Sequence, residues 1–197
     1  MHVLVVTAHP SSTSRTQAVA RAIVDDIKGA GHTAELADLA AEGFDPVFGP
    51  ADWAAQNGEA PRSPEVHAEH ARLDRADRLV LVYPVYWWSM PALLKGWIDR
   101  VFVSGWAFDG EEEGRIVKKL GRLGVHLVAL GDGSARTYSR HGYAEAMRVQ
   151  IDHGIFDFCG APVLASHLVV PDEAGTAVDP RDTARRVAAG LTQDVPA

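Results

Sequence analysis

The chain has 197 residues, 47% of them hydrophobic and 23% charged, which fits one globular domain with a substantial core. Its formal net charge of −7 argues against a general nucleic-acid binder and against a protein that binds membrane surfaces. No apolar stretch reaches the roughly 18 residues of a membrane span, and the single cysteine, Cys159, excludes an intrachain disulfide. We therefore expect one domain over residues 1–197, no membrane insertion and a cytoplasmic location.

The first predicted strand covers residues 2–7 and begins directly after Met1, which leaves no room for a signal peptide. Residues 8–16 (AHPSSTSRT) follow as a loop rich in hydroxyl groups, and an amphipathic helix comes next. We expect a Ser or Thr to cap that helix and its first N–H groups to form a phosphate site. An N-cap with solvated serines and no ligand is the alternative. Neither a Gly-x-Gly-x-x-Gly pattern nor a Walker lysine is present in this loop.

A second strand is predicted over residues 33–39, where apolar and polar residues alternate as they do at the edge of a sheet. Residues 40–64 have no clear periodicity and are rich in proline and glycine. A loop of that length in a compact domain is usually functional or partly disordered. Trp53 is the residue of this loop that we expect to be anchored in the protein.

A short helix is predicted over residues 64–76, with His67 and His70 three residues apart. Two histidines at that spacing can share a metal ion, but no third ligand stands nearby in the sequence. We therefore expect two solvated histidines and no metal site. Cys159, near the end of a later helix, follows an apolar run, and we expect it to fill the core rather than to act as a nucleophile.

The third strand is predicted over residues 78–83, because Leu79 to Val82 form an apolar run typical of a strand buried on both faces. Pro84 has no N–H to continue a ladder, so we expect the strand to end there. Tyr86, Trp87 and Trp88 follow, before a helix over residues 91–102. Three successive rings cannot all point inward, so at least one should line a surface or a cleft. Ligands of open α/β sheets bind outside the carboxyl ends of the strands, and this aromatic loop therefore favours a flat, stackable ligand over simple core filling.

Residues 105–114 are predicted as a loop, and residues 123–130 as the fourth strand. The loop Gly131-Asp132-Gly133-Ser134 follows that strand, and we place Tyr138 on the same loop. Glycines at such a position let the backbone approach a ligand closely, and we expect the N–H groups of Gly131 and Gly133 to be available to it. An ordinary turn is the alternative.

A long helix over residues 142–159, a fifth strand over residues 162–170 and a closing helix over residues 178–191 complete the pattern. The repeated alternation of strand and helix predicts an α/β fold, a flavodoxin-like doubly wound five-stranded parallel sheet with strand order 2-1-3-4-5. In that order the first, third and fourth strands are neighbours. The three loops that follow them should therefore converge at one crevice.

The segment YPVYWWSMPALLKGWIDRVFVSGWAFDG resembles that of the flavodoxin-like NAD(P)H:quinone oxidoreductases, which include the DT-diaphorase type, the modulator of drug activity type and ancillary subunits of potassium-efflux systems. The resemblance implies a bound flavin. Its isoalloxazine ring would lie against a ledge formed by Pro84, Val85, Tyr86, Trp87 and Trp88. It also implies that residues 40–64 pack on the partner of a homodimer and border the flavin site.

The opening AHP and the residues after it are also similar to the family's first loop. The motif implies contacts to the flavin phosphates from His9, Thr13, Ser14, Arg15 and Thr16. Members of the family often carry an aromatic residue at the position of Arg15 and asparagine at that of Thr16. This chain differs at both positions, which leaves the individual phosphate contacts open.

The run GDGSARTYSRHGY is similar to the family's glycine-rich loop, which implies that Gly131, Asp132 and Gly133 contact the pyrimidine edge of the flavin. Tyr138 would then donate a hydrogen bond to quinone or nicotinamide. The DT-diaphorase type has a histidine six residues after this tyrosine, where this chain has Ala144, and His141 is the candidate substitute. Asp132 replaces a residue that is usually small, and its charge would disfavour negative charge on a reduced flavin.

The resemblance implies a two-electron, flavin-dependent NAD(P)H oxidoreductase acting on quinones or related aromatic acceptors. FAD is the expected cofactor because residues 65–102 look more like the FAD-binding members, with FMN as the alternative. Two other functions are kept open. One is a flavin-bound regulatory subunit of a cation-efflux transporter, and the other is a one-electron carrier of the flavodoxin type.

Overall fold

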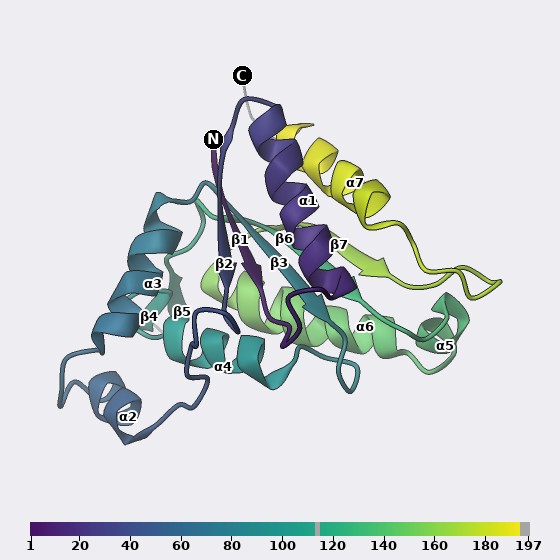
Figure 1. Cartoon of the computed structure of the whole chain (residues 1–197). Helices are drawn as coiled ribbons and strands as arrows, with labels where there is room; N and C mark the ends of the chain where they lie inside the picture. Colours follow the sequence, from purple (N-terminus) through teal and green to yellow (C-terminus); the bar gives the residue numbers. More distant parts are fainter. Residues whose placement is uncertain (113–114, 194–197) are drawn as a thin grey trace.

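The computed structural model describes residues 1–112 and 115–193. A five-stranded parallel sheet with the order β2-β1-β3-β6-β7 forms its centre (Figure 1). The strands are β1 (His2–Thr7), β2 (Thr33–Asp38), β3 (Arg78–Pro84), β6 (Gly124–Leu130) and β7 (Val163–Val169). The predicted fold class and strand order are therefore confirmed.

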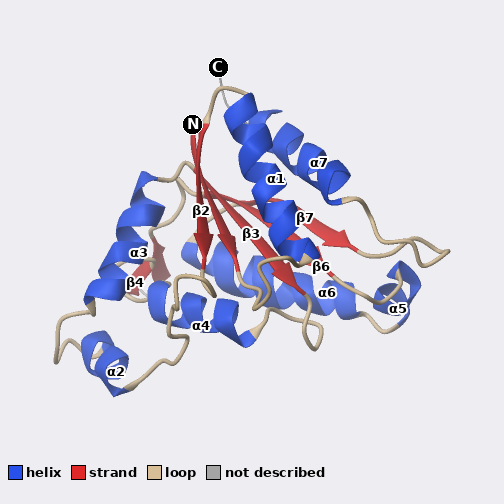
Figure 2. Ribbon diagram, viewed as in Figure 1, coloured by secondary structure: helices blue, strands red, loops and turns tan. Residues whose placement is uncertain are grey.

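Helices cover both faces of this sheet (Figure 2). Helices α1 (Arg15–Gly29) and α7 (Pro180–Gln193) pack on one face. On the other face lie α3 (Pro64–Arg75), α4 (Ala92–Val101), α6 (Tyr143–Met147) and the π-helix η1 (Arg148–Asp157), which continues α6. The central strands β1, β3 and β6 are buried on both faces, which is why they are apolar runs rather than alternating sequences.

Three elements that precede β6 lie outside the helices and strands predicted from the sequence. Helix α2 (Pro50–Gln56) starts with a proline, and the backbone N–H of Gly49 donates to Asp52 Oδ2 at 3.0 Å. Strands β4 (Phe108–Glu112) and β5 (Arg115–Lys118) form a separate antiparallel pair. Neither α2 nor β4 has an apolar periodicity that would reveal it: no residue of α2 is buried, and β4 reads FDGEE.

The prediction for Trp53 was wrong, because its side chain is 60% exposed. Phe44 anchors this segment instead: it is 7% exposed and packs into the core, with the Arg100 guanidinium 5.2 Å from its ring centre. The prediction for His70 was also wrong. Its Nε2 lies 2.8 Å from the carbonyl oxygen of Val101, and its ring stacks on Trp106 at 4.2 Å. Burial lowers the pKa of His70 and outweighs the opposite effect of the Val101 hydrogen bond.

Cys159 is buried as predicted, and burial raises the pKa of its thiol to about 11. In the described part of the chain, no three histidine, cysteine or acidic side chains are grouped as metal ligands would be. The described helices include none with the length and apolar character that a bilayer crossing requires.

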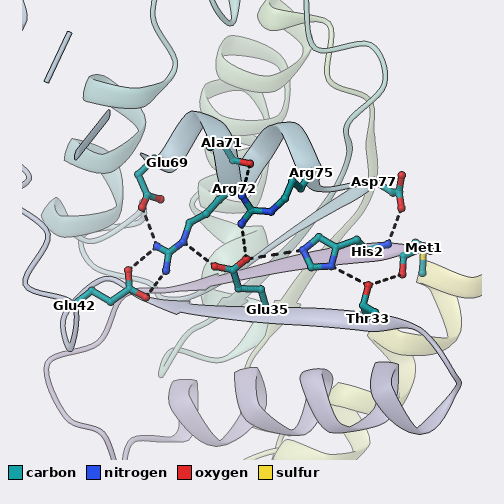
Figure 3. Close-up of polar contacts among 10 residues, drawn as sticks. All are labelled: Met1, His2, Thr33, Glu35, Glu42, Glu69, Ala71, Arg72, Arg75 and Asp77. Atoms are coloured by element: carbon teal, nitrogen blue, oxygen red, sulfur yellow. Dashed lines mark hydrogen bonds and ion pairs between the residues drawn. The ribbon is translucent and has the colours of Figure 1, made fainter. Parts of the chain in front are cut away.

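A charge network fastens the β2 edge of the sheet to α3 (Figure 3). Arg72 donates to Glu35 at 2.8 Å, to Glu42 at 2.6 Å and to Glu69 at 2.9 Å. The other oxygen of Glu69 accepts a hydrogen bond from the indole N–H of Trp97 at 2.9 Å, so the network reaches into the core. The guanidinium of Arg72 thus joins β2, the loop after it and α3.

Candidate functional site

The carboxyl ends of β1, β3 and β6 lie side by side. Thr7 at the end of β1 pairs with Val82, and Pro84 at the end of β3 pairs with Leu130. The backbone N–H of Val85 donates to the carbonyl of Leu130 at 2.8 Å, which holds the loop after β3 against the end of β6. The three loops singled out in the sequence therefore begin at adjacent points along one edge of the sheet.

The first loop ends in a capped helix. Ser14 is the N-cap of α1, and its Oγ accepts a hydrogen bond from the N–H of Gln17 at 3.2 Å. Among the described residues nothing accepts the N–H groups of Arg15 and Thr16, and the first turn of α1 has no acidic side chain. The start of α1 can thus take an anion, because unpaired N–H groups and the helix dipole attract negative charge.

The side chains of this loop differ in how far they are available to a ligand. Thr13 is exposed, and its hydroxyl lies 3.1 Å from that of Ser11. Arg15 is half-buried and forms no ion pair within the part of the chain described. Thr16 is only 3% exposed, so its backbone is better placed than its side chain. His9 is turned back on the loop, where its Nδ1 accepts the N–H of Ser11 at 3.0 Å.

The second loop is a tight turn over residues 86–89, closed by two backbone hydrogen bonds of 3.0 Å between Tyr86 and Ser89. Its central residues Trp87 and Trp88 have φ of 50° and 60°, a left-handed conformation that bulky residues rarely adopt. Such residues cost about 1–3 kcal/mol each and persist only where their surroundings hold them. Trp87 is 94% exposed and Tyr86 46% exposed, which confirms that the three rings do not all point inward.

Trp88 is held by rings from the third loop region. It stacks on Tyr143 with 3.8 Å between ring centroids and meets the ring of Tyr138 edge-on at 5.4 Å. His141 also stacks on Tyr143, with 5.3 Å between the two ring centroids. The hydroxyl of Ser89 also donates to Gln150 at 2.6 Å, so the turn is tied to η1 as well. Tyr143 was not among the predicted site residues; its signal in the sequence is an aromatic residue in an otherwise polar stretch.

In the third loop the sequence placed Tyr138 wrongly. It lies on a short helix, α5 (Ala135–Arg140), which Ser134 caps by accepting the N–H of Thr137. A Cβ on Gly131 would lie 2.2 Å from the Tyr138 hydroxyl, so only glycine allows the phenol to lie over the end of β6. The N–H of Gly131 donates to Val169 at 2.9 Å. The prediction that this N–H is available to a ligand was therefore wrong. Gly131 instead leaves space for the Tyr138 hydroxyl.

Tyr138 is 2% exposed, and no described residue hydrogen-bonds its hydroxyl. Burial, and secondarily the negative charge of Asp132, raises the pKa of Tyr138. The phenol is therefore protonated at neutral pH and can donate a hydrogen bond. Asp132 itself is exposed at the edge of the loop.

A cavity of about 180 Å³ joins the second and third loops. It is lined by Val85, Trp87, Trp88, Asp132, Gly133 and Tyr138. All six are among the predicted site residues, and they come from two loops that are 44 or more residues apart in the sequence. None of the first-loop residues lines this cavity, although their strand is the next one in the sheet. The volume suits a flat ring system held between aromatic side chains.

Comparisons with known proteins agree with this geometry. Residues 1–190 match a family described as having a flavodoxin-like fold. NAD(P)H dehydrogenase (quinone) 1 of Rattus norvegicus is 31% identical over 188 residues, which are 84% of this chain and 67% of the rat protein. Ribosyldihydronicotinamide dehydrogenase (quinone) of Pongo abelii is 30% identical over 187 residues, which are 84% of this chain and 80% of that protein.

Solved structures give the same picture. An NAD(P)H:quinone oxidoreductase from Methanothermobacter marburgensis has a TM-score of 0.84 and 28% sequence identity, over 98% of this chain and 99% of that one. General stress protein 14 of Treponema denticola, solved in complex with FMN, has a TM-score of 0.67 and 22% identity, over 98% of this chain and 99% of that one. At that identity the second likeness shows the fold alone.

Proposed function

Because the chain belongs to the family with the flavodoxin-like fold, and its relatives at 30% identity or more include NAD(P)H and dihydronicotinamide quinone dehydrogenases, we propose that it is a flavin-dependent NAD(P)H:quinone oxidoreductase. The observation that carries this proposal is the aromatic cavity at the ends of β3 and β6, into which a protonated Tyr138 projects from one side. Quinones are the proposed acceptors, and azo or nitro aromatics suit the same apolar slot.

The described residues fit a flavin on two separate grounds. The turn over residues 86–88 and the loop around Gly133 line a slot for a flat ring. The start of α1 has free N–H groups and no acid, as a phosphate tail needs. Ser14 accepts a hydrogen bond through its oxygen, which leaves its own proton free to donate to a phosphate. A flavin bound here supplies the hydride chemistry of the reaction.

We propose the following roles for the chain's own residues. Trp87 and Trp88 stack on the planar reactants and exclude water from the slot. Tyr138 donates its hydroxyl proton in a hydrogen bond to the carbonyl oxygen of the acceptor, where negative charge grows during reduction. Tyr143 holds Trp88 in place, and His141, stacked on Tyr143 at the rim, is the second candidate for a polarising group.

The remaining cofactor contacts are also proposals. The phosphate group is assigned to Thr13, Ser14, Arg15 and Thr16, with His9 beside it. The ring is assigned to Pro84, Val85 and the three aromatic residues after them, with Asp132 and Gly133 at its pyrimidine edge. We propose FAD as the flavin, with FMN as the alternative, in a cytoplasmic homodimer whose chain folds as one domain.

The purified protein tests the proposal directly. We expect flavin absorption bands, a released chromophore with the mass of FAD, and rapid oxidation of NADPH or NADH with a simple benzoquinone as acceptor. A colourless protein that does not take up added FAD or FMN would overturn the assignment. A chromophore with the mass of FMN would change only the choice of flavin.

The same preparation separates the two alternatives, neither of which the relatives favour. A regulatory subunit would bind a transporter and turn over benzoquinone negligibly. A one-electron carrier would accumulate a stable radical form during titration with dithionite, whereas a two-electron reductase would show little of it.

A further inference from the structure

A second cavity, of about 220 Å³, opens between strand β7 and the continuous helix formed by α6 and η1. It shares no lining residue with the aromatic cavity at the ends of β3 and β6. Its walls are mostly apolar, formed by Leu127, Ala129, Met147, Ile151 and Leu168. Five polar or charged side chains also line it: Tyr83, Asp152, Ser166, Arg148 and His167. Arg148 is paired with Glu145 at 2.8 Å, and burial lowers the pKa of His167, so Tyr83, Asp152 and Ser166 are the groups that we consider for a ligand.

Tyr83 is the unusual group in this cavity. Its side chain is 1% exposed, it lines the cavity, and its hydroxyl has no hydrogen-bond partner among the described residues. The hydroxyl oxygen itself is not among the fully buried unpaired polar atoms, so it reaches the cavity, where it can donate to a ligand or accept from one. Burial, and secondarily the charge of Asp152, raises the pKa of Tyr83, so the phenol keeps its proton and offers a donor.

Asp152 offers the matching acceptor. Its Oδ2 accepts a hydrogen bond from the hydroxyl of Ser166 at 2.6 Å, which fixes the carboxylate at the cavity. Its Oδ1 has no partner in the part of the chain described. Tyr83 and Asp152 together therefore present one free donor and one free acceptor beside the apolar walls. A ligand hydroxyl satisfies both, since it donates to Asp152 and accepts from Tyr83. An ammonium group cannot accept from Tyr83. A carboxylate would lie against Asp152, and the cation that lines the cavity, Arg148, is already paired with Glu145.

The volume limits the ligand to a small molecule. An apolar cavity of about 150 Å³ holds a benzene ring, so 220 Å³ has room for two fused rings or for one ring with a short alkyl chain. We propose that this second cavity binds a small neutral aromatic alcohol, with its hydroxyl between Tyr83 and Asp152 and its rings against β6, β7 and η1. The proposal does not depend on the proposed oxidoreductase activity.

Calorimetric titration of the purified, flavin-saturated protein with 2-naphthol tests this site. We expect saturable binding of one molecule per chain. Tyr83→Phe should weaken it about fivefold, the value of one hydrogen bond, without lowering the free energy of unfolding, since the deleted hydroxyl has no partner. The methyl ether of 2-naphthol, which lacks the donor, should bind wild type about fivefold more weakly as well.

Two further variants locate the ligand. Ala144 lies exposed on the rim of the cavity, so Ala144→Leu should block binding, whereas Ala146→Leu, exposed on the same helix but outside the lining, should preserve it. Trp88→Ala should also preserve binding, because Trp88 belongs to the other cavity. The proposal is wrong if 2-naphthol does not bind, or if its affinity is unchanged by Tyr83→Phe and Ala144→Leu but lost in Trp88→Ala.

Discussion

Polar groups are paired with other protein groups in the network at the β2 edge of the sheet, and several are left unpaired within the described residues of the carboxyl edge. At the β2 edge, Arg72 is matched by three carboxylates, and Glu69 is bonded on both oxygens. At the carboxyl edge, the hydroxyl of Tyr138 and the first N–H groups of α1 find no partner among the described residues. The polar groups of the β2 edge are paired with one another and stabilise the fold, whereas those of the carboxyl edge stay available to a ligand.

The backbone conformation also differs between the two regions, being regular at the β2 edge and strained in the turn after β3. The network joins regular elements, β2 and α3, in ordinary conformations. The turn after β3 places Trp87 and Trp88 in the left-handed region, with Trp87 almost wholly exposed. Conformations of that kind persist at functional sites because the rest of the fold offsets their cost. Substitutions in the network should therefore lower stability, and substitutions around the turn should lower activity.

Arg72→Met should have the largest effect. It leaves the carboxylate of Glu69, whose side chain is 6% exposed, without its charged partner. Breaking a buried ion pair in this way costs about 3 kcal/mol, and we expect that loss in the free energy of unfolding measured with urea. Turnover per folded molecule at saturating substrate should stay close to that of wild type.

Arg75→Met is the matched control. Arg75 is on the same helix and also contacts Glu35, but its side chain is 58% exposed. An exposed pair is worth less than about 1 kcal/mol. Equal destabilisation by the two substitutions would contradict the claim that the network stabilises through buried charge.

Tyr138→Phe should show the reverse pattern. It removes a hydroxyl that has no partner in the described structure, so the free energy of unfolding should change little. Acceptor reduction should fall about a hundredfold, the lower end of what a positioned proton donor contributes. Flavin content and steady-state turnover measured on one preparation check this. Equal loss of flavin and turnover would remove Tyr138 from the catalytic group.

Tyr143 tests whether the turn is held by its neighbours. Tyr143→Ala removes the ring on which Trp88 stacks, so the acceptor slot should loosen and KM for the quinone should rise about tenfold, which corresponds to about 1.4 kcal/mol. Tyr143→Phe keeps the stacking ring and should restore the wild-type KM. If the phenylalanine variant is as impaired as the alanine variant, the hydroxyl and not the stack is what matters.

The sheet and the aromatic cavity at the ends of β3 and β6 were predictable from the sequence. Buried strands give apolar runs, and alternation of such runs with helices specifies a doubly wound sheet. That topology brings the ends of β3 and β6 together, and it therefore predicts Trp88, Gly133 and Tyr138 at one crevice. These inferences rest on periodicity and connectivity, which are properties of the sequence itself.

The missed features depend on contacts between distant segments. Helix α2 buries no residue of its own, and the side chain of Asp52 instead accepts from Arg100 at 3.1 Å. The stack of Trp88 on Tyr143 joins the turn after β3 to the start of α6, which follows a left-handed glycine, Gly142, with φ of 70°. No spacing rule reports a ring stack or a guanidinium contact of this kind, because the partners are set by tertiary packing.

The smallest expected effect is the contribution of His70 to the pH dependence of stability. Burial lowers its pKa below the ordinary value of 6.5, so below that pH the unfolded chain binds a proton that the folded chain resists. Stability should therefore fall as the pH drops below about 6.5, by at most about 1.4 kcal/mol per pH unit for one such proton. The same sign holds for His167, whose pKa burial also lowers.

His70→Gln keeps a donor for the Val101 carbonyl but cannot titrate. Urea unfolding between pH 7.5 and 5.5 should therefore show a smaller loss of stability in this variant than in wild type. His67→Gln, at an exposed position one turn earlier, is the matched substitution control. An identical slope in wild type and His70→Gln would mean that the buried imidazole is not linked to folding in this range.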